Sequence, residues 1–151
     1  MSFLSLNQLD SLFRSIANAH HQIHDYAFGE LWEIEEKMNK EAKYPLLYVS
    51  PIDSKSGEQV KERSFHFIVM DIPRKDNSNI KEVWSDTEQI LDDVIRILQY
   101  KGKDYDVVGE PTLLPFKEDH SDWVAGFRAE VVIQSDFFNN YCSVPADGFS
   151  N

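Results

Sequence analysis

The sequence predicts a single α+β domain, in which a mainly antiparallel sheet packs against two amphipathic helices in the order α-β-β-β-α-β-β. Two segments with apolar residues at helical spacing predict the helices. Runs of consecutive extended segments with no helix between them predict the antiparallel sheet. The 151 residues suffice for one globular domain, and 42% hydrophobic residues allow a real core.

The first segment is predicted to be a helix. Ser5 can cap its N-terminus, and Gln8 stands three residues later, as a capping box requires. Apolar residues then recur at helical spacing as Leu9, Leu12, Phe13, Ile16 and Ala19. We expect this helix to end within residues 19–21.

Three extended segments follow. Residues 26–34 suggest a strand bulged at Gly29, and residues 44–51 a second strand. The charged residues 35–43 and the polar stretch Asp53 to Glu62 are expected to be loops, the latter a long hairpin connection. Residues 64–72 are apolar on both faces, which predicts a central strand.

The second half contains the strongest helical pattern, from Ile80 to Leu98, and an acidic outer face. Gly102 is expected just past its end, between Lys101 and Lys103. Residues 105–114 suggest a strand broken by Gly109 and Pro111, and residues 122–133 alternate as a long amphipathic strand. The periodicity then stops, so we expect a domain over 1–135 and an irregular extension over 136–151.

The charge balance disfavours several classes of function. Asp and Glu total 26 against 15 Lys and Arg, for a net charge of -11. Binding to nucleic acid or to anionic lipid would need a surplus of basic residues. No apolar run is long enough for a membrane span, and we expect no signal peptide. The single Cys142 excludes an internal disulfide and a cysteine-based zinc site.

No residue pattern predicts catalysis, a metal site or a cofactor. His20, His21 and His24 lack the glutamate of a metalloprotease motif. Asp92 and Asp93 have no neighbouring Lys, His or Ser that would define an acid and a base. Glycine-rich phosphate loops and nucleophile elbows are absent from the sequence. We therefore expect a protein that is not an enzyme, with an acidic metal-dependent hydrolase and a monomeric protein-binding adaptor as the alternatives.

Five segments, in this order, resemble small tailed-phage proteins of the tail-completion, tail-terminator or head–tail neck type. They are Phe28–Ile34, Tyr44–Val49, Phe65–Asp71, Ser85–Val94 and Asp122–Gly126. The resemblance covers residues 5–135 and lies in the order and texture of the elements.

The resemblance implies a structural virion protein with an α+β domain, assembled in the host cytoplasm and located in the tail or neck. Such proteins form rings, commonly of six copies and in some necks of twelve, that join the tail tube to the head connector. The expected partners are therefore other copies of the chain and other virion proteins.

Two candidate interfaces follow from this expectation. Basic residues near the predicted hairpin could meet an acidic helix face of a neighbouring copy; the first set is Lys55, Lys61 and Arg63, and the second is Glu82, Asp86 and Glu88. An aromatic group in the tail could dock on an adjacent protein; it consists of Phe137, Phe138 and Tyr141.

Overall fold

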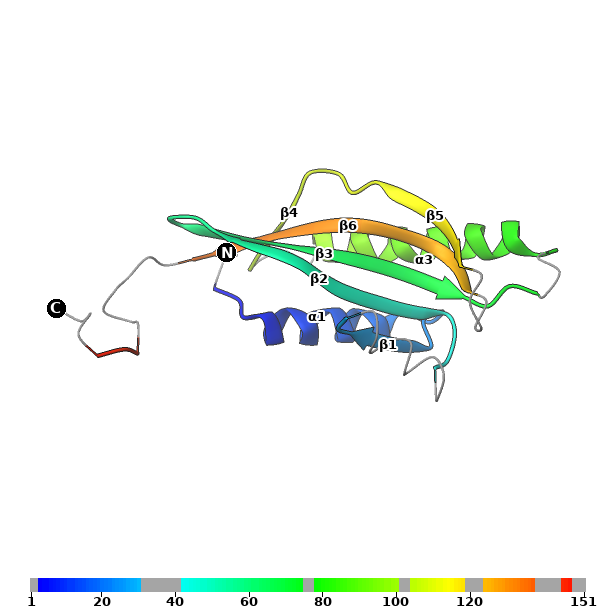
Figure 1. Ribbon diagram of the computed structural model, residues 1–151, viewed down its shortest axis with the longest axis horizontal. Helices are drawn as coiled ribbons and strands as arrows, with labels where there is room; N and C mark the ends of the chain where they lie inside the picture. The colour runs from blue at the N-terminus through cyan, green and yellow to red at the C-terminus, as the bar shows by residue number, and fades with distance from the viewer. Residues whose placement is uncertain are drawn as a thin grey trace.

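The computed structural model describes residues 3–30, 42–74, 78–100, 104–118, 124–137 and 145–147. Within these residues, two helices pack on a six-stranded, mostly antiparallel sheet (Figure 1). The predicted α+β class and order of elements are confirmed, with the broken strand of residues 105–114 present as two short strands.

The first helix, α1, spans Leu6–Ala19 and begins with the predicted capping box. The backbone N–H of Gln8 donates to Ser5 Oγ over 3.2 Å, and the Ser5 N–H donates to Gln8 Oε1 over 2.8 Å. The two bonds satisfy donors that a helix N-terminus otherwise leaves free. The buried residues of α1 are Leu9, Phe13, Ile16 and Ala17, so Ala17 takes the core position predicted for the exposed Ala19.

The second described helix, α3, spans Ile80–Tyr100, in agreement with its apolar pattern. Its buried stripe consists of Val83, Thr87, Ile90, Leu91, Val94, Ile95 and Leu98. Thr87 is polar, but its hydroxyl donates to the carbonyl oxygen of Val83 over 2.7 Å, which removes the cost of burying it. The predicted helix end at 101–103 lies outside the described residues.

The sheet has the order β1-β2-β3-β6-β4, and β5 pairs with β6 beside β4. The strands are β1 (Asp25–Phe28), β2 (Leu46–Ser56), β3 (Val60–Asp71), β4 (Asp106–Val108), β5 (Leu113–Glu118) and β6 (Val124–Asp136). β3 lies between β2 and β6 and pairs antiparallel with both, which confirms the predicted central strand. β1 pairs parallel with β2 and forms one edge.

The prediction of a long loop from Asp53 to Glu62 is wrong. β2 continues to Ser56 and β3 begins at Val60, so only residues 57–59 connect them. The N–H of Gly57 donates to the carbonyl oxygen of Val60 over 2.9 Å and closes the turn. The ladder continues through polar residues because backbone groups form it, with Ser56 opposite Lys61.

The first strand is shorter than predicted. β1 ends at Phe28, and Gly29 adopts a φ of 149°, a conformation that L side chains rarely adopt. The rest of the predicted strand and most of the following loop fall in residues 31–41, outside the described residues. β6 is described from Val124 onward, and the predicted start of this strand at residue 122 lies outside the described residues.

The core lies between the helices and one face of the sheet. Phe13 of α1 packs edge-on against Phe65 and Phe67 of β3, with ring centroids 5.2 and 4.9 Å apart. Both helices contribute to this one cluster, so both cover the same face, as predicted. The other face carries a smaller buried cluster of Leu46, Tyr48, Met70 and Val124.

Candidate functional site

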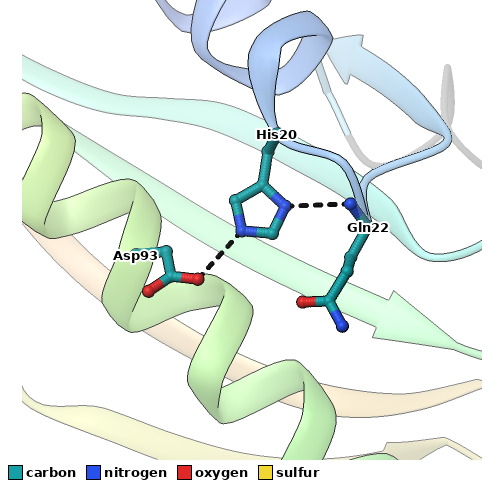
Figure 2. A network of polar contacts seen from close by, with 3 residues as sticks. All are labelled: His20, Gln22 and Asp93. Atoms are coloured by element: carbon teal, nitrogen blue, oxygen red, sulfur yellow. Dashed lines mark hydrogen bonds and ion pairs between the residues drawn. The ribbon is translucent and has the colours of Figure 1, made fainter.

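Of the histidines near the end of α1, His20 lies in a small network of polar contacts (Figure 2). His20 Nε2 lies 2.9 Å from Oδ2 of Asp93 on α3, and the backbone N–H of Gln22 donates to His20 Nδ1 over 3.1 Å. Because Nδ1 accepts a hydrogen bond, Nε2 carries the ring proton and donates to the carboxylate. His24 Nδ1 lies 2.7 Å from the carbonyl oxygen of Tyr44. The network joins α1 to α3.

Across the part of the chain that the structure describes, no group of three or more His, Cys, Asp or Glu residues could hold a metal ion. Of the two adjacent aspartates on α3, Asp92 is exposed to solvent and Asp93 contacts His20. The contact of Asp93 with His20 joins α3 to the end of α1.

Two buried tyrosines also connect helices to neighbouring segments. The Tyr26 hydroxyl donates to Oδ1 of Asp10 over 2.7 Å, and Arg14 lies over the tyrosine ring, 4.9 Å from its centroid. Burial, followed by the hydrogen bond to Asp10, raises the pKa of Tyr26 well above its ordinary value. The Tyr105 hydroxyl donates to the carbonyl oxygen of Leu98 over 2.6 Å, and burial raises its pKa to about 12.

The hairpin of residues 51–64, called the arm below, projects at one end of the molecule (Figure 1). β1 pairs with β2 only as far as Val49, and residues 51–59 are all exposed. Among the described residues, the outer edge of β2 therefore has no strand beside it in the arm. Such an edge presents backbone N–H and C=O groups to other chains.

The predicted interface residues of the arm differ in their surroundings. Lys55 is exposed, whereas Lys61 is half-buried with its Nζ 5.6 Å from the ring centroid of Phe137. The N–H of Phe137 donates to the carbonyl oxygen of Gln59 over 2.8 Å. Phe137 therefore lies against the arm. Phe138 and Tyr141 lie outside the described residues.

Arg63 is buried, with only 5% of its surface exposed. It alternates with Phe65 and Phe67 along β3, so its side chain lies on the helix-covered face of the sheet. Among the residues that the structure describes, its buried Nη1 atom finds no hydrogen-bond partner. Burial lowers the pKa of the guanidinium. A second buried atom without a hydrogen bond, Ser135 Oγ, lies on the adjacent part of β6.

The predicted acidic face is exposed to solvent. Glu82, Asp86 and Glu88 lie in the first half of α3. In Figure 1, α3 begins at one end of the long axis, whereas the tip of the arm lies at the other. The structure therefore does not bring the basic and acidic sets together within one protomer.

Two hollows were not expected from the sequence. One, of about 520 Å³, lies beside the connection between β4 and β5. The exposed residues His66, Arg128 and Glu130 form part of its lining. The other, of about 220 Å³, lies between the arm and the start of α1, and Arg63 forms part of its wall. The period of two from Phe67 through Phe65 to Arg63 is the sequence signal that places this arginine inside.

No protein-family model matches this sequence, and no curated protein shows significant similarity to it. In the described part of the chain, no helix has both the length and the apolar character needed to cross a membrane.

Proposed function

We propose that this chain is a structural virion protein of a tailed phage, which forms a ring at the neck or the top of the tail. The ring would join the tail to the head connector and line the path of the DNA. The resemblance of residues 5–135 to tail-completion, tail-terminator and neck proteins motivates the proposal. The α+β architecture with both helices on one sheet face is compatible with it.

The observation that carries the proposal is the separation of the arm, whose outer β2 edge has no strand beside it among the described residues, from the acidic first half of α3. The arm, with the exposed Lys55, lies at one end of the long axis, and the acidic first half of α3 begins at the other (Figure 1). A ring of identical subunits needs two different, complementary surfaces on each copy. An arm that meets the α3 of the next copy supplies such a head-to-tail contact.

The net charge of -11 fits a wall along which DNA slides. An acidic surface repels phosphate and does not hold it. The ring is most simply a hexamer, with a dodecamer as the larger possibility that the resemblance implies. The tail tube and a ring on the connector side are the proposed neighbours.

Native mass measured over a concentration series, with negative-stain images of the largest species, tests the proposal. We expect a closed ring with a central hole wide enough for duplex DNA. A K55E/K61E variant should weaken assembly, whereas K43E/R96E, with the same change of charge away from the arm, should not. A protein that stays monomeric at every concentration would contradict assembly by the free chain and favour the adaptor. Tight stoichiometric binding of a divalent metal would favour the hydrolase.

A further inference from the structure

Among the described residues, Arg63 has a buried guanidinium nitrogen without a hydrogen-bond partner. The residue is 95% buried, and its Nη1 atom has no hydrogen bond. A buried charge without a partner is strongly unfavourable, and arginine does not lose its proton near neutral pH. Desolvation lowers the pKa of this guanidinium. A carboxylate from another chain would supply the missing bond.

The hollow beside Arg63 has the shape and chemistry to admit that partner. Its volume is about 220 Å³, and its walls include Leu6, Pro51 and Phe65. It lies beside the exposed edge of β2, beyond the last pair between β1 and β2, so another chain can reach it. The lining is apolar only in part, since Asp53 and Ser54 also belong to it. The apolar part suits the methylene groups of an acidic side chain, and the guanidinium suits its carboxylate.

Asp53 also lines this hollow, but it is exposed and leaves Nη1 of Arg63 without a bond. The first half of α3 offers three exposed carboxylates at the other end of the molecule, on Glu82, Asp86 and Glu88. In a head-to-tail assembly, that end of one copy meets the arm of the next. A second copy of this chain is therefore the occupant that charge and placement favour.

We propose that the hollow is a receptor for an acidic side chain from the first half of α3 of a second copy, and that Arg63 binds its carboxylate. The inference rests on the proposed ring and identifies the contact that would fix its register. It also gives the basic residues different roles. Lys55 would attract the acidic α3 of the next copy from an exposed position, an effect that salt weakens, whereas Arg63 would form a buried ion pair with one of its carboxylates.

The substitution Arg63→Met tests this inference, because methionine keeps an unbranched side chain and removes the charge. We expect the thermal midpoint of the protomer to stay unchanged or rise, since no bond of the protomer is lost. The dissociation constant for self-association should rise at least about thirtyfold, because a buried carboxylate of the next copy loses its partner. Arg96→Met, which removes an exposed charge from α3, is the matched control and should leave assembly unchanged.

The acidic side gives an independent measurement that does not disturb the core. Glu82→Gln, Asp86→Asn and Glu88→Gln change exposed residues, and at least one should reproduce the assembly defect of R63M. An R63M protein with a clearly lower thermal midpoint would show that Arg63 has a partner in its own protomer, such as Asp53, and would overturn the inference. A wild-type ring that R63M also forms would overturn the inference alone. A wild type that never assembles would overturn the proposed ring and the inference together.

Discussion

Gly126 lies in β6 where three strands meet, and its substitution by alanine is the sharpest test of the sheet geometry. It pairs with Met70 of β3 on one side and with Phe116 of β5 on the other. A Cβ atom at this position would lie 1.9 Å from the carbonyl oxygen of Val69, and 3.0 Å from the Cα of Met70. These atoms belong to the backbone of the central strand, so no side-chain rotation relieves the contact.

The loss of stability expected for Gly126→Ala follows from the 1.9 Å between the added Cβ and the carbonyl oxygen of Val69. Relief of the contact requires β6 and β3 to separate locally by about 1 Å or more, because atoms pack at roughly 3.5 Å. Such a shift weakens about two ladder hydrogen bonds, worth about 1 kcal/mol each. Overpacking of a tight site adds about 1–3 kcal/mol. We therefore expect Gly126→Ala to lower the free energy of unfolding by about 3 kcal/mol or more, and the thermal midpoint by about 6–12 °C.

Urea unfolding followed by circular dichroism and tryptophan fluorescence measures this loss, with the denaturant slope as a check on two-state behaviour. Gly109→Ala is the matched control. Gly109 has a φ of +71°, but a Cβ there would meet nothing within 4 Å. Gly109→Ala should lower the free energy of unfolding by about 1–2 kcal/mol, because the alanine would have to adopt this left-handed backbone conformation. A G126A protein as stable as the wild type, or a G109A protein less stable than G126A, would contradict this expectation.

Three further predictions concern single polar groups. Ser5→Ala removes the N-terminal cap of α1 and should lower the free energy of unfolding by about 1 kcal/mol, measured as a lower thermal midpoint. An unchanged midpoint would mean that the capping box does not stabilise the protein. Burial raises the pKa of Asp71, so ionisation lowers stability as pH rises above about 4; Asp71→Asn should stabilise the protein at pH 7 but not at pH 3, and equal effects at both would contradict this. Tyr105→Phe removes the hydrogen bond to the Leu98 carbonyl oxygen and should lower the free energy of unfolding by about 1–2 kcal/mol at pH 7. The unfolded tyrosine ionises at about pH 10, whereas the folded Tyr105 has a pKa of about 12, so this difference from the wild type should narrow as pH rises through that interval.

The helices could be predicted from sequence because their signals are local. The apolar stripe of α3 depends only on residues three and four apart, and the box of Ser5 and Gln8 depends on one turn. The long strand β6 could also be predicted, because the buried Phe127, Ala129 and Val131 alternate with outward-facing residues. In each case, the side chains that face the core carry the pattern.

The arm could not be predicted because its strands face no core on the β2 side. Residues 51–56 are exposed on both faces, so no alternation of apolar and polar residues distinguishes them from a loop. Their extended form comes from backbone pairing with β3, which in turn pairs with β6 as far as Asp136. The parallel pairing of β1 with β2 is likewise a long-range choice that no local signal specifies.

The sequence predicted which basic residues belong to the candidate interface, but not which of them are buried and which are exposed. The basic set was expected as one exposed group, whereas the structure buries Arg63 and exposes Lys55. Elsewhere in the described residues, pattern, capping and packing largely agree, and a local conflict in a folded chain is where a functional role is most often found. An exposed strand edge beside a buried arginine without a bond is such a conflict. It is resolved if the arm has an acidic partner, and for that reason Arg63→Met separates the stability of the protomer from its assembly.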